Sequence, residues 1–187
     1  MQVSRKLGFL VGSVAISATL CLQTATANAQ TANVTVTGTS GTLGFVTPPA
    51  TFAFGGVTSG AIAVNSTASE AMDVNDATGS GAGWNIQITG ANLVSGSNNI
   101  PASNVTVTGA PTYACDAANS CTVPTNSGGV SYAPWVLSTS AQKFISVSAN
   151  KGMGTSSTTN TFTMVVPGGT PGGTYSATWT VSLISGP

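Results

Sequence analysis

The sequence contains no histidine and almost no charge. Four of its 187 residues are Lys or Arg and four are Asp or Glu, so charged residues make up 4% of the chain. General acid–base catalysis at neutral pH needs a side chain that titrates near the working pH, and histidine is the usual one. Its absence predicts that the protein is not an enzyme. The scarcity of Lys and Arg also excludes a basic surface for phosphate groups, so nucleic acid is not an expected partner.

Cysteine is also rare, with three residues in the chain. Cys21 falls within an N-terminal apolar segment, which leaves Cys115 and Cys121 in the rest of the protein. Two thiols in an exported chain favour a disulfide, and the turn-forming residues 116–120 between them can fold back. A zinc site is the alternative, but two thiols without histidine fill only half of a tetrahedral site. We therefore expect a disulfide, no metal and no cofactor.

The N-terminal residues have the pattern of a signal peptide. Arg5 and Lys6 precede an apolar stretch at residues 7–22, and residues 27–29 form an Ala-Asn-Ala cleavage site. We expect the mature protein to begin at Gln30, outside the membrane.

Two other interpretations of this segment are possible. A transmembrane helix is one, but the apolar stretch is shorter than the roughly 20 residues that a span needs. Lipidation at Cys21 is the other, although Leu20 stands before it, where lipoprotein signals typically have a small residue. We therefore expect the mature chain to have no transmembrane segment.

Apolar and polar residues alternate with a period of two along the rest of the chain. Trp84, Ile86 and Ile88 alternate with polar residues, and Val105 and Val107 alternate with threonines. Such alternation predicts half-buried strands. The same pattern occurs at residues 34–36, 144–148, 161–166 and 175–183. Loops rich in Gly, Pro, Ser and Asn separate these segments, for example at residues 47–50, 78–83, 95–99, 126–129 and 167–173.

These patterns predict the fold class. We expect residues 1–29 to form the signal peptide and residues 30–187 to form one all-β domain. Its predicted architecture is a single antiparallel β-sandwich of the Ig-like or Greek-key type with long Gly/Ser/Asn loops, because two facing sheets bury one face of every strand.

Two tryptophan segments carry a resemblance to a known family. Residues 76–88 read DATGSGAGWNIQI, and residues 173–187 read GTYSATWTVSLISGP. Together they resemble the two motifs of the WxL domain, a cell-wall-binding surface domain of Gram-positive bacteria. Further landmarks follow in the family's order: GTLGF at residues 41–45, Phe54-Gly55, ANKGMGT at 149–155 and VVP at 165–167. The chain departs from the family at both motif leucines, where it has Ile86 and Val181.

The resemblance implies non-covalent attachment to the cell surface, through peptidoglycan, another cell-wall polymer or other surface proteins. The candidate binding residues at the motif positions are Trp84, Ile86, Trp179, Val181, Asp76 and Gly83. We expect Trp84 to be the more exposed tryptophan, because the glycine loop before it leaves one side of the ring uncovered. We expect Trp179, with Ala177 and Val181 on its own face, to lie in the core. Trp135 opens a literal W-x-L triplet outside both motif positions, which we interpret as coincidence.

The first tryptophan segment also invites a calcium hypothesis. Asp73, Asn75, Asp76 and Thr78 supply oxygen atoms of the kind that Ca²⁺ prefers. Their spacing does not match an EF-hand loop, because Ala77 stands where a ligand is needed. A hydrogen-bonding role for Asp76 in the turn is the alternative.

Two further functions compete with wall attachment. A small, neutral, Thr-rich β-protein could be the structural subunit of a pilin-like surface polymer or extracellular matrix, and lend residues 32–39 to a neighbour by strand addition. It could also be a secreted carbohydrate-binding module. Detergent-resistant ladders would favour the polymer, and binding to soluble glycans would favour the module. All three functions place the protein outside the cell.

Overall fold

The computed structural model describes residues 41–187 except residues 48, 50, 58–59, 117–120 and 127–128. The predicted signal peptide and residues 32–39 lie outside the described residues. The described part consists of strands and loops with one short 3-10 turn, η1 (Ala102–Asn104), which confirms the all-β prediction. Within it, no helix is long and apolar enough to cross a membrane.

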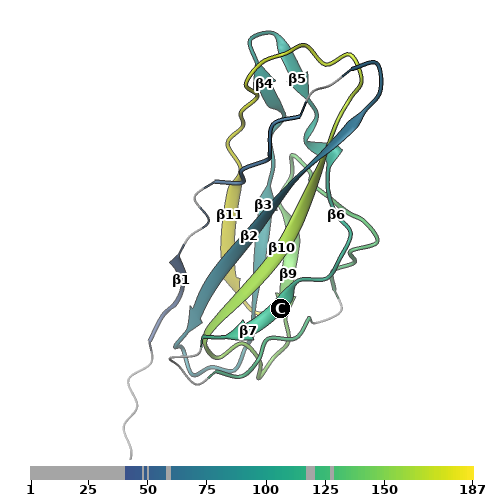
Figure 1. Ribbon diagram of the computed structural model, residues 1–187. Helices are drawn as coiled ribbons and strands as arrows, with labels where there is room; N and C mark the ends of the chain where they lie inside the picture. The colour runs from purple at the N-terminus through teal and green to yellow at the C-terminus, as the bar shows by residue number, and fades with distance from the viewer. Residues whose placement is uncertain (1–40, 48, 50, 58–59, 117–120, 127–128) are drawn as a thin grey trace, which may run out of the picture. The chain divides into compact units, whose positions relative to one another are not determined.

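The larger sheet is built around two long strands, which pair antiparallel along their whole length from Val64↔Val166 to Asp76↔Gly154. In sheet order its strands are β1 (Leu43–Thr47), β2 (Val64–Asp76), β10 (Gly154–Val166), β6 (Val105–Val107) and β8 (Trp135–Val136), and β7 (Thr112–Cys115) also pairs with β10. Figure 1 shows β2 and β10 side by side as the two longest strands.

The smaller sheet has three strands, in the order β11 (Thr180–Ser185), β3 (Trp84–Thr89) and β9 (Gln142–Val147). A separate hairpin joins β4 (Leu93–Ser95) to β5 (Asn98–Ile100). The ladders between these named strands are antiparallel. The predicted antiparallel sandwich is therefore confirmed.

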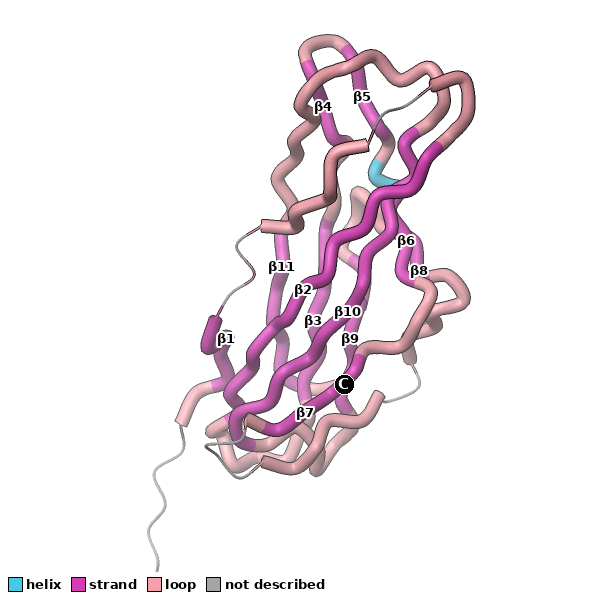
Figure 2. The backbone as a smooth tube through the Cα atoms, in the orientation of Figure 1, coloured by secondary structure: helices cyan, strands magenta, loops and turns pink. Residues whose placement is uncertain are grey.

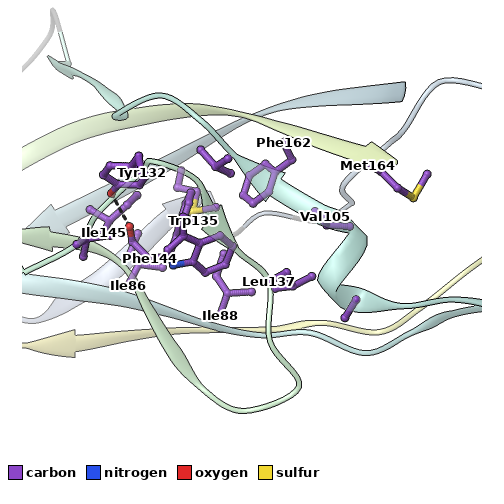
Figure 3. Packing of buried hydrophobic residues seen from close by; sticks show 14 of the residues in the cluster. Ile86, Ile88, Val105, Tyr132, Trp135, Leu137, Phe144, Ile145, Phe162 and Met164 are labelled. Atoms are coloured by element: carbon purple, nitrogen blue, oxygen red, sulfur yellow. Dashed lines mark hydrogen bonds between the residues drawn. The ribbon is translucent and has the colours of Figure 1, made fainter. Parts of the chain in front are cut away.

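Aromatic rings form a continuous chain through the core between the two sheets. Trp135 contacts Phe144 with 4.8 Å between the ring centroids, and Phe144 contacts Phe162 at 5.2 Å (Figure 3). Phe162 in turn meets Phe52 edge-on at 4.9 Å. Phe52 belongs to the loop between β1 and β2, so the aromatic chain ends at this loop. Figure 2 draws the described part of the loop in pink.

Candidate functional site

The first tryptophan of the motif pair is a core residue. Trp84 is 0% exposed, and its indole N–H donates to the backbone oxygen of Gly152 at 3.1 Å. It begins β3, the central strand of its sheet, which pairs with β9 at one edge and with β11 at the other. The expectation that Trp84 is the more exposed tryptophan is therefore wrong. Its side chain packs in the hydrophobic core, and the glycine loop before it leaves no side of the ring exposed.

Glycines give the Trp84 side chain its place. A Cβ on Gly152 would lie 2.5 Å from Nε1 of Trp84, so only a residue without a side chain fits under the indole. Gly83 has φ +75°, and a Cβ there would lie 2.3 Å from the backbone oxygen of Val147. Both glycines therefore allow a close approach that any other residue would block.

Three other motif residues, Ile86, Asp76 and Gly83, are also buried. Ile86 is part of the core cluster, and Asp76 lies at the end of β2 with little exposure. The Oδ1 atom of Asp76 accepts hydrogen bonds from the backbone N–H and the hydroxyl of Thr78, at 3.1 and 2.6 Å. These bonds close the turn locally, as the hydrogen-bonding alternative to calcium predicts. Among the described residues, no group of three or more acidic, Cys or His side chains could hold a metal ion.

The second tryptophan lies at the edge of the core. Trp179 is partly buried, and its indole N–H donates to the backbone oxygen of Ala91 at 3.2 Å. Its ring packs against Phe52 at 5.0 Å and Phe54 at 6.1 Å. The sequence predicts a core position for Trp179, and the structure corrects this: the ring forms part of a surface groove instead.

This groove has a volume of about 1030 Å³. One wall is the loop at residues 51–57, and the other is the extended segment at residues 170–179 with Val181 at the start of β11. The volume is at the upper end of the range typical of ligand pockets. Aromatic and aliphatic side chains form its floor, and the polar members of its lining are Thr51, Thr170, Thr174, Ser176 and Thr178. Among the described residues, no Asp, Glu, Lys or Arg lines it.

Side-chain contacts hold the loop at residues 51–57. Besides its two phenylalanine rings, Ser66 donates a side-chain hydrogen bond to the backbone oxygen of Gly55 at 2.6 Å. The backbone N–H of Ala53 donates to the carboxylate of Glu70, which lowers the pKa of Glu70, but burial raises it by more. The loop is not part of either sheet, so side chains rather than a strand ladder keep this wall of the groove in place.

The two cysteines pair as the sequence predicts. Cys115 ends β7 and is bonded to Cys121, with 5.6 Å between their Cα atoms. The bridge lies outside the groove. The literal W-x-L triplet is also separate from it: Trp135 is a buried residue of β8, and its indole N–H donates to the backbone oxygen of Lys143 at 3.1 Å.

Sequence reasoning missed Phe52 and Phe54, which surround Trp179. The only available signal was the Phe54-Gly55 pair among the family landmarks. Comparisons of the chain with protein-family models, with curated proteins and with solved structures found no match. The geometry of the groove is therefore the main evidence for function.

Proposed function

We propose that the protein is an exported cell-surface protein that binds non-covalently to the cell wall, or to partner surface proteins, through a WxL-like domain. The observation that carries the proposal is the position of the second tryptophan segment. Residues 173–179 and Val181 line a groove of about 1030 Å³, and the described residues of its lining carry no charge. A motif that resembles a surface-attachment motif and also forms a groove is well placed to make the attachment itself.

The chemistry of the groove favours a neutral ligand. A strongly anionic polymer would lose the hydration of its phosphates here without gaining a cationic partner, which is costly. The glycan strand of peptidoglycan is uncharged over most of its surface, and it offers hydroxyl and amide groups to the threonines that line the groove. An uncharged segment of a partner protein is the second ligand of this class.

The six motif residues divide into two roles under this proposal. Trp179 and Val181 form part of the binding surface. Trp84, Ile86, Asp76 and Gly83 are buried in the frame that supports it. The described residues of the groove lining offer no carboxylate, amine or thiol, so we propose binding without catalysis.

Sedimentation with insoluble peptidoglycan tests the proposal. The purified exported protein is mixed with cell walls, with walls stripped of teichoic acids, and with walls stripped also of proteins. A bound fraction that survives both extractions identifies peptidoglycan as the ligand, and a fraction lost with the proteins identifies a protein partner. A protein that sediments with none of the three preparations would contradict the proposal.

A matched pair of variants places the contact in the groove. Thr178 is exposed and lines the groove, whereas Thr67 is exposed on β2 and lies outside it. Thr178→Lys introduces a charge and a long side chain, so we expect about tenfold weaker binding, equivalent to about 1.4 kcal/mol. Thr67→Lys makes the same chemical change, and we expect it to bind as the wild type does.

A further inference from the structure

The outer edge of β11 has backbone groups that no described residue uses. Among the described strands, β11 pairs with β3 alone. The N–H of Gly186 donates to the oxygen of Gly83 at 2.9 Å, toward β3. Because backbone groups alternate in direction along a strand, those of Val181, Leu183 and Ser185 point to the opposite side. Within the described part of the chain, no backbone hydrogen bond reaches this side of β11.

β1 lies beside part of β11, but the sequence of this edge lacks the features that normally prevent strand pairing. Its sequence, TVSLIS, has no charge and no proline, and its ladder to β3 has no bulge. β1 differs, because a register shift interrupts its ladder between Phe45 and Thr47. β9 carries Lys143, and its ladder to β3 is also shifted. A straight, uncharged edge is a template for a further strand.

The chain itself contains a sequence suited to this edge. The hexapeptide NVTVTG occurs twice, at residues 33–38 and at residues 104–109. The second occurrence contains β6, where Val105 and Val107 are 0% and 1% exposed, and β6 lies between β10 and β8. This fold therefore already uses the hexapeptide as a strand that buries both of its valines. The first occurrence lies outside the described residues.

We propose that residues 33–38 of a second copy of the chain add to the outer edge of β11 as a further strand. The hexapeptide matches the six residues of β11 in length and has no charge. Val34 and Val36 would continue the apolar face formed by Val181 and Leu183, and the main chain would bond to the unused groups of the edge. This self-assembly goes beyond the proposed wall attachment and does not depend on it.

A second copy fits this edge better than the same molecule does. The N–H of Gly41 donates to the oxygen of Ala77 at 2.8 Å, which fixes the chain beside the larger sheet. Residues 33–38 of the same molecule would have to pair in parallel. β11 ends opposite Trp84, at the end of the sandwich where Gly41 meets Ala77, so a segment that leads along β11 to Gly41 would run in the same direction as β11. A second copy can pair antiparallel, as the described strands do, which is slightly more stable.

Complementary variants of the full exported chain test this proposal. Val34→Asp/Val36→Asp damages the donor segment, and Ser185→Pro removes an edge N–H without touching the ladder to β3. Light scattering coupled to size-exclusion chromatography measures mass over a concentration series. We expect the wild type to assemble with rising concentration and each variant to remain monomeric. Mixing the two variants should restore a one-to-one complex, because one keeps the edge and the other keeps the donor.

A second acceptor variant covers the case in which Ser185→Pro fails to fold, which circular dichroism detects. Ile184→Lys places a charge on β11 at a side chain that is 40% exposed, and Val136→Lys makes a similar change on the edge strand β8 at one that is 38% exposed. We expect only Ile184→Lys to prevent assembly. A wild type that stays monomeric throughout the series would overturn the proposal, as would folded edge variants that assemble normally or a mixture that stays monomeric.

Discussion

Replacing Gly152 by alanine should disrupt the contact that holds Trp84 in the core. The new methyl group would lie 2.5 Å from Nε1 of Trp84 and 2.9 Å from Cγ1 of Val147, and Gly152 has φ +70°. The left-handed backbone costs a non-glycine residue about 1–2 kcal/mol, and overpacking a core costs about 1–3 kcal/mol. Gly152→Ala should therefore lower the free energy of unfolding by about 2–5 kcal/mol.

A double-mutant cycle separates the steric part from the backbone part. Trp84→Phe removes Nε1, the atom nearest to the new methyl group. By itself this variant loses the bond to Gly152, worth about 1 kcal/mol, and some packing. In the double variant part of the steric cost should be relieved. We therefore expect the double variant to lose at least about 1 kcal/mol less stability than the sum of the losses of the two single variants. Urea denaturation followed by circular dichroism measures all four proteins. Additive effects would refute the close packing of Trp84 on Gly152.

Three further predictions concern stability. The hydroxyl of Tyr113 is buried and has no hydrogen-bond partner among the described residues, so Tyr113→Phe should raise the free energy of unfolding by about 1 kcal/mol. Tyr132→Phe removes a buried hydrogen bond to the backbone oxygen of Phe144, so it should lower the free energy of unfolding by about 1 kcal/mol. Urea titration of both variants measures these changes. Burial raises the pKa of Glu70 above 4.5, so the folded state binds this proton more tightly than the unfolded state does. The stability of the protein should therefore fall as pH rises through the window above 4.5. Glu70→Gln should reduce that fall, which thermal melts across pH measure. Replacing Cys115 and Cys121 by serine should lower the free energy of unfolding by about 2 kcal/mol, and an unchanged urea midpoint would contradict a stabilising bridge.

The sandwich could be predicted from the sequence because its signal is local. Period-two alternation marks each strand without reference to its neighbours, as β6 shows with two buried valines around an outward threonine. The disulfide could also be predicted, because only two cysteines follow Cys21 in the sequence. The relative exposure of Trp84 and Trp179 could not be predicted from the sequence, because it depends on the order of the strands in the sheet. β3 is central in its sheet, and alternation is the same in a central strand and an edge strand.

The groove could not be predicted for a similar reason. Its walls, residues 51–57 and 170–179, are more than a hundred positions apart in the sequence and meet through the rings of Phe52, Phe54 and Trp179. Residues 51–54 read Thr-Phe-Ala-Phe, an alternation that is also found in strands, yet the structure has a loop there. Nothing local in the sequence tells which distant tryptophan the two phenylalanines will contact.

The most direct test of the central claim compares Trp179→Phe with Trp135→Phe in the peptidoglycan sedimentation assay. Each variant loses one indole hydrogen bond to a backbone oxygen, of Ala91 at 3.2 Å and of Lys143 at 3.1 Å. Trp179 lines the groove and Trp135 does not. We predict about tenfold weaker binding for Trp179→Phe, equivalent to about 1.4 kcal/mol, and wild-type binding for folded Trp135→Phe. Equal binding by the two folded variants would contradict attachment through the groove.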